Sequence, residues 1–127
     1  MTSLQAEKPE GNLDQAIVAK AALRAANRLG LPAKTLAGII GLSKATISRL
    51  RRGEAELQPA GKQFELAVLF IRFFRSLDAV LGGDEAVARD WLNHQNIALG
   101  ARPIDKIVSV TGLFDAISYL DSRRAIV

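Results

Sequence analysis

The chain has 127 residues, of which 49% are hydrophobic, and it contains no cysteine. This length suits one sizeable core or two helical subdomains, and the lack of cysteine excludes disulfides, thiolate metal sites and thiol nucleophiles. The net charge is +4, and splitting the chain after Lys62 gives +5 for the first part and −1 for the second. A polyanion is therefore expected to bind the first part, with the acid-free stretch from Lys34 to Arg52 as the predicted footprint, although basic runs also serve as solubilising surface.

The N-terminal residues carry no apolar stretch of the kind found in signal peptides and membrane anchors. Residues 1–12 are therefore predicted to be a disordered lead, and the protein is predicted to be cytoplasmic. An alanine-rich helix is expected to begin at Asn12 or Asp14, to continue to Leu29 and to stop at Gly30, because alanine is the best helix former and glycine ends helices.

Two helices separated by a tight turn are predicted within residues 32–53. Ala37 lets the helices approach closely, Gly41 permits a positive φ in the turn, and Ile47 with Leu50 packs the second helix against the first. This pattern resembles the Cro/repressor-type helix-turn-helix of the Xre-like class. The same arrangement also occurs in helical bundles that do not bind DNA, which is the alternative.

The second of these helices is predicted to be the recognition helix. Its N-terminal end and outer face stay exposed when its apolar positions are buried, and such a surface meets base edges in the major groove. The basic side chains suit phosphate contacts as well as base contacts, so the sequence does not assign base readout to any one of them. The predicted DNA-binding residues are Lys34, Ser43 (as the helix cap), Lys44, Ala45, Thr46, Ser48, Arg49, Arg51 and Arg52.

Residues 64–81 form the most apolar segment and are predicted to be a central helix. Charged residues interrupt the segment, which makes a membrane span unfavourable. Phe70, Phe73 and Leu77 lie on one side and Leu66 near another, so the apolar surface is wider than one packing face requires. Both an internal core position and a homodimer seam explain this width.

Four elements are expected after Gly83: a helix that begins with Asp84 and Glu85 and ends near Asn93, a loop over residues 96–103, a helix over Ile104–Val110, and a last helix that follows Gly112 and ends near Leu120. Trp91 is interpreted as a core residue because it lies at helical spacing from Val87. His94 is interpreted as a loop residue, since no cysteine or cluster of acids accompanies it as metal ligands.

A series of short motifs follows in the second half: Asp90-Trp91-Leu92-Asn93, Asn96-Ile97-Ala98-Leu99-Gly100, Arg102-Pro103-Ile104-Asp105, and then Gly112 and Tyr119-Leu120. In this order they resemble the toxin-binding domain of the Xre/MbcA/ParS antitoxin family, over roughly residues 60–127. The resemblance implies an all-α chain with a Cro/repressor-like helix-turn-helix in residues 13–60 and a small helical toxin-binding and dimerisation domain in residues 61–127.

The function that this resemblance implies is that of a type II antitoxin, which binds and neutralises a RES-domain toxin that consumes NAD and represses its own operon by binding operator DNA. It implies a homodimer and no cofactor, metal, membrane or small-molecule substrate. The chain departs from the common family pattern because it ends a few residues after the last expected helix. The toxin-binding residues carried over from the resemblance are Asn96, Leu99, Gly100, Arg102, Pro103, Arg123, Arg124, Ile126 and Val127.

Two other classes of function compete with the antitoxin. A free-standing helix-turn-helix regulator, whose second half dimerises or senses a ligand, is the alternative. An enzyme is disfavoured, because the sequence has no glycine-rich phosphate loop, no Ser-His-Asp arrangement around His94 and no pair of acids singled out by spacing.

Overall fold

The computed structural model describes the backbone of residues 2–126 and the side chains of residues 14–125. Within this range the chain forms helices and one isolated bridge between Asn96 and Ala101, so the predicted all-α fold class is confirmed. The helices are α1 (Thr2–Arg28), α2 (Ala33–Ile40), α3 (Lys44–Arg51), α4 (Lys62–Leu81), α5 (Glu85–Asn93), α6 (Pro103–Lys106) and α7 (Val110–Ile126).

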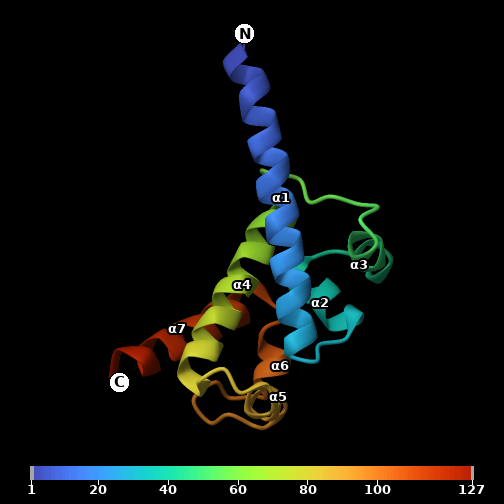
Figure 1. Cartoon of the computed structure of the whole chain (residues 1–127). Helices are drawn as coiled ribbons and strands as arrows, with labels where there is room; N and C mark the ends of the chain where they lie inside the picture. Colours follow the sequence, from blue (N-terminus) through green and yellow to red (C-terminus); the bar gives the residue numbers. More distant parts are fainter. Residues whose placement is uncertain (1, 127) are drawn as a thin grey trace.

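Helix α4 occupies the centre of the molecule (Figure 1). It packs against α1 and α2 on one side and against α5 and α7 on the other, so both halves of the chain contribute to one apolar core. Phe70, Phe73 and Leu77 of α4 are fully buried. Of the two explanations for the wide apolar surface of this helix, the core position therefore accounts for most of it, and Val68 is the large apolar side chain of α4 that remains clearly exposed. None of the helices in the described range combines the length and apolarity of a membrane span.

Helix α1 starts earlier than the sequence predicted. The backbone is helical from Thr2, which places the expected disordered lead of residues 1–12 within α1, beyond the body of the fold (Figure 1). Most residues around Pro9 and Gly11 are good helix formers, which is consistent with a helical backbone there. The predicted end of the helix is correct, because the chain leaves α1 at Gly30 with φ of 67°.

A side chain from the second half covers the C-terminal end of α1. The guanidinium Nε of Arg89, on α5, donates to the carbonyl oxygen of Arg28 at 3.1 Å. A Cβ atom on Gly30 would lie 3.2 Å from this nitrogen, so the glycine leaves room for Arg89 as well as forming the turn. Since unpaired carbonyls at a helix C-terminus attract cations, Arg89 fastens α5 to α1.

The last two helices differ from the prediction. Helix α6 ends at Lys106, before the expected Val110, and Gly112 lies inside the first turn of α7 instead of separating two helices. Ser109, which precedes α7, caps the N-terminal end of this helix, since its Oγ accepts the Gly112 amide hydrogen at 3.0 Å. A side chain at Gly112 would collide with the backbone carbonyl of Lys106, so this glycine permits the close approach of α6 and α7.

The C-terminal segment is also helical beyond the predicted limit. Helix α7 was expected to end near Leu120, but it continues to Ile126. The residues that follow Leu120 contain neither glycine nor proline, so nothing in the sequence stops the helix there. Arg123 and Arg124 consequently project from a helix and not from a flexible tail.

Candidate DNA-binding and partner-binding surfaces

The N-terminal end of α3 is fixed by local hydrogen bonds. The Ser43 side chain accepts the Thr46 amide hydrogen at 3.1 Å, which confirms Ser43 as the helix cap. The hydroxyl of Thr46 in turn accepts a hydrogen bond from Nη2 of Arg49 at 3.1 Å. The Arg49 guanidinium is thereby oriented on the exposed side of α3.

Burial divides α3 into a packing side and an open side, as the sequence predicted. Ile47 is fully buried and Leu50 is nearly so, while Lys44, Ala45 and Arg49 are exposed. The turn before α3 has the expected geometry, because Gly41 adopts φ of 83° and closes α2 through the carbonyl of Ala37. Thr46 and Ser48 are half-buried, at the edge of the open side.

The basic residues predicted to bind DNA differ in how their charge is used. Lys34, Lys44 and Arg51 are exposed and make no ion pair with another residue of the described part of the chain. Arg52 pairs with Glu54 at 3.1 Å, so part of its charge is compensated within the chain. The first three residues and Arg49 therefore offer the stronger attraction for phosphate.

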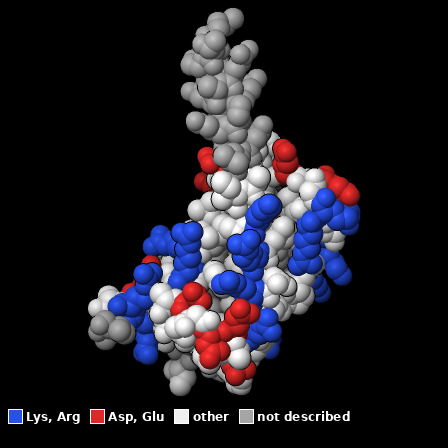
Figure 2. All heavy atoms as spheres, in the orientation of Figure 1, with Lys and Arg blue, Asp and Glu red and all other residues white. Residues whose placement is uncertain are grey.

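A basic row on α1 was missed in the list of predicted DNA-binding residues. Lys20, Arg24 and Arg28 are exposed and follow one another at intervals of four, which places them on one side of the helix. Figure 2 shows a row of Lys and Arg side chains along α1 beside a second group over α3. The spacing of four was the signal that could have identified the row. No acid occurs from residue 15 to residue 53, so the basic surface covers α1 as well as α3.

The loop after α5 is a compact turn. The amide of Asn96 donates to the carbonyl of Ala101 at 3.0 Å, and its side chain accepts the amide hydrogen of Leu99 at 3.1 Å. Asn96 and the half-buried Leu99 therefore hold the turn together, and Gly100 supplies a positive φ of 73°. The turn displays Ile97, whose 96% exposure makes it the most accessible large apolar residue of the described chain. Ile97 belongs to the motif that begins at Asn96 but was not among the predicted toxin-binding residues, although an isoleucine inside an Asn-to-Gly turn is itself an indication.

Arg102 and Pro103 stabilise the start of α6. The Arg102 guanidinium donates two hydrogen bonds to Asp105, at 2.9 and 3.2 Å, and this contact together with the carboxylate charge raises the pKa of Arg102. Pro103 is fully buried, so its predicted role as a toxin contact is corrected to a packing role at the first position of the helix.

The remaining predicted toxin-binding residues lie at the end of α7. Arg123 and Arg124 are exposed, and neither forms an ion pair within the described residues. Val127 and the side chain of Ile126 lie outside the described residues. Across the molecule, the structure thus separates the predicted sites: α3 lies on one side, and the end of α7 lies on the other (Figure 1).

Two residues interpreted from the sequence as structural have local explanations. Trp91 is half-buried and its ring lies 6.3 Å from that of Phe73, which supports the core interpretation. Nδ1 of the exposed His94 donates to the carbonyl oxygen of Asp90 at 2.6 Å, at the end of α5. Among the described residues there is no group of three potential metal-ligating side chains.

Two family models match the chain. Residues 11–72 match the antitoxin Xre-like helix-turn-helix domain, and residues 76–125 match the antitoxin Xre/MbcA/ParS C-terminal toxin-binding domain. No curated protein matches the chain. The two matched segments meet within α4 and leave few residues of the chain uncovered. The chain therefore joins an Xre-like helix-turn-helix domain to an Xre/MbcA/ParS C-terminal toxin-binding domain, which is the composition of an antitoxin with a DNA-binding half.

Proposed function

We propose that the protein neutralises a RES-domain toxin that consumes NAD, and that it represses the operon encoding both proteins. The observation that carries this proposal is the presence of two separate surfaces on one helical core. One is the open side of α3 with its unpaired cations, and the other lies in the half that matches a toxin-binding domain. An antitoxin that regulates its own operon needs both surfaces.

Operator binding follows from the chemistry of α3. Its exposed N-terminal end would enter the major groove, with Lys44, Ser48 and Arg49 nearest to the base edges. Lys34 and the basic row of Lys20, Arg24 and Arg28 would attract the flanking phosphates. If the protein binds as a homodimer, two α3 helices about 34 Å apart would require a nearly palindromic operator.

Toxin neutralisation is assigned to the half that matches the toxin-binding domain. Ile97 at the tip of the loop and the arginines of the last turns of α7 are exposed side chains of this half. They would act by stoichiometric occlusion of the toxin, because binding one folded protein over an active site blocks substrate without any chemistry in the inhibitor. The proposal places the complex in the cytoplasm, where NAD is available to the toxin.

Co-expression with the product of the adjacent gene, which the proposal expects to be a RES-domain protein, tests the proposal. We expect a stable complex on pull-down and light scattering, relief of the growth arrest caused by the toxin, and retarded migration of promoter DNA. An absence of complex together with intact promoter binding would favour a free-standing regulator. A complex that relieves growth arrest without promoter binding would remove autoregulation from the proposal.

A further inference from the structure

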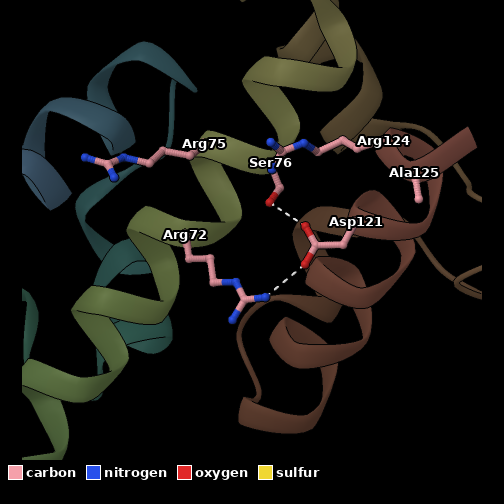
Figure 3. Close-up of a pocket in the computed structure, with 6 residues that line it drawn as sticks. All are labelled: Arg72, Arg75, Ser76, Asp121, Arg124 and Ala125. Atoms are coloured by element: carbon pink, nitrogen blue, oxygen red, sulfur yellow. Dashed lines mark hydrogen bonds and ion pairs between the residues drawn. The ribbon is translucent and has the colours of Figure 1, made fainter. Parts of the chain in front are cut away.

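A groove of about 510 Å³ runs between α4 and α7, on the side of the molecule away from α3. Figure 3 shows Arg72 and Ser76 of α4 directed toward Asp121 of α7, with Arg124 reaching across above them. Arg75 of α4 also lines the groove, but its guanidinium points away from Asp121 and Arg124, toward the hollow that it shares with residues of α1 (Figure 3). We call this region, with its three arginines and one aspartate, the α4–α7 groove.

The single acid of the groove is already engaged. Asp121 accepts hydrogen bonds from Oγ of the buried Ser76 at 2.8 Å and from Nη2 of Arg72 at 3.0 Å. The Ser76 hydrogen bond, followed by the contact and charge of Arg72 and the charge of Arg124, lowers the pKa of Asp121. Its carboxylate therefore neutralises one arginine, which leaves the uncompensated charge of Arg124 over the groove and that of Arg75 at the edge toward α1. Neither arginine has an ion-pair partner within residues 14–125.

Apolar surface continues from both ends of this basic centre. Arg72 and Arg75 also border a hollow of about 400 Å³ in which Ile17 and Val68 are 55% and 44% exposed. At the other end Arg124 borders a hollow of about 300 Å³ together with Val80 of α4. Along α4 the surface is thus apolar at one end, basic in the middle and apolar at the other end. A segment that carries carboxylates between apolar side chains would match this order in both charge and polarity.

Charge and position distinguish the possible occupants. A duplex bound to α3 would lie on the side of the molecule opposite to α7 and its Arg124 (Figure 1). A second copy related by a two-fold axis through the centre of the groove would bring the cations near that axis close to their own copies, and like charges in contact disfavour such an interface. A protein partner with exposed carboxylates would neither lie on the wrong side of the molecule nor bring like charges together. Arginine also pairs with carboxylates in a bidentate manner.

We propose that the α4–α7 groove receives an acidic and apolar segment of the toxin, with one carboxylate held by Arg124 over the groove and another by Arg75 at the edge that faces α1. This inference rests on the proposed function for the identity of the partner. To the predicted contact Arg124 it adds Arg75, which belongs to the central helix and lies outside the motifs of the second half.

The first experiment measures the affinity of full-length variants for the RES-domain toxin. Arg75→Glu and Arg124→Glu should each weaken the complex by about tenfold or more, because they place a carboxylate opposite a carboxylate. Arg124→Lys should lose less, since it keeps the charge. Arg51→Glu is the matched control: it changes the net charge equally on exposed α3 and should leave toxin affinity within about twofold. Equal losses in the α3 and groove variants, or no loss in the groove variants, would overturn the proposal.

The second experiment does not need the toxin. A synthetic peptide of repeated Glu-Leu pairs is titrated into the isotopically labelled full chain, and the same peptide with glutamine in place of glutamate serves as its control. Amide shifts near Ser76 and Arg124 that only the acidic peptide produces, and that Arg124→Glu abolishes, are the expected result. Shifts produced there by duplex DNA, equal binding of both peptides, or a change in molecular mass caused by Arg124→Glu would contradict the assignment. If the wild-type chain forms no toxin complex, the proposed function fails, and the peptide titration still decides whether the groove recognises an acidic segment.

Discussion

The two halves of the molecule use their charged side chains differently. In the helix-turn-helix half most exposed cations are unpaired, and the exception among the predicted DNA-binding residues is Arg52 with Glu54. In the C-terminal half most cations are paired within the chain, as in Arg89 with Glu85, Arg102 with Asp105, and Lys106 with Asp115. Unpaired cations are free to attract a polyanion, whereas paired ones hold helices and turns in place. The unpaired arginines of the second half, including those of the α4–α7 groove, therefore stand out as candidates for partner binding.

The halves also differ in the range of their polar contacts. The hydrogen bonds of α3 join residues three positions apart, whereas Arg72 meets Asp121 and Arg89 meets Arg28 across large separations in sequence. Local contacts make α3 a self-contained surface. Long-range contacts bind the second half to α4 and α1, so the two halves share a core although they carry different surfaces.

The largest effect we predict tests whether the halves unfold together. Phe73→Ala should lower the free energy of unfolding by about 3–5 kcal/mol, because it opens a cavity beside Phe70 and Trp91 in the shared core. Trp91 is the only tryptophan, so its fluorescence reports the second half while circular dichroism reports all helices. Both signals should shift together. Val68→Ala, at an exposed position of the same helix, is the control and should have a much smaller effect. A tryptophan transition that precedes the loss of helix would mean that the halves are independent.

A second prediction compares one glycine from each half. Gly112→Ala should lower the free energy of unfolding by about 2–3 kcal/mol, because its Cβ meets the backbone carbonyl of Lys106, which cannot move without separating α6 from α7. Gly38→Ala should be neutral or stabilise the protein by about 0.5–1 kcal/mol, since its Cβ reaches only ordinary contact with Val108 and alanine favours helix α2. Chemical denaturation of both variants measures the difference. Equal stability of the two variants would rule out the close approach at Gly112.

This glycine also shows why the sequence predicted the first half better than the second. The turn at Gly41 and the cap at Ser43 are local signals, and both are present in the structure. A glycine such as Gly112 is typical of a break between helices in the sequence. Its actual role is to leave room for the carbonyl of Lys106, which tertiary packing brings against it. The groove residues were equally hidden, because Arg72 and Asp121 are 49 positions apart and only the packing of α4 on α7 brings them together.

The third prediction uses the difference between unpaired and paired cations on the DNA-binding surface. Arg49→Ala should weaken operator binding by about tenfold and reduce its salt dependence, while toxin affinity stays unchanged. Arg52→Ala should have a smaller effect, because Glu54 already compensates part of that charge. Titrations of operator DNA at several salt concentrations measure both variants. Equal losses for the two variants would show that pairing within the chain does not predict DNA contact, and a parallel loss of toxin binding by Arg49→Ala would contradict the separation of the two surfaces.

The smallest effect concerns a paired acid of the second half and depends on pH. Asp121→Ala should lower the free energy of unfolding by about 1 kcal/mol at neutral pH, because it removes the acceptor of the buried Ser76 and the partner of Arg72 at a site that solvent partly screens. The pKa of Asp121 is lowered in the folded protein, so its contribution is present above the ordinary carboxyl pKa of about 4 and disappears as the pH falls through the folded value. The difference between wild type and variant should therefore shrink below about pH 4. Asp115→Ala, which removes only the exposed pair with Lys106, is the control and should cost about 0.5 kcal/mol or less. A difference for Asp121→Ala that stays constant down to acid pH would mean that packing of the side chain, and not its charge, joins α7 to α4.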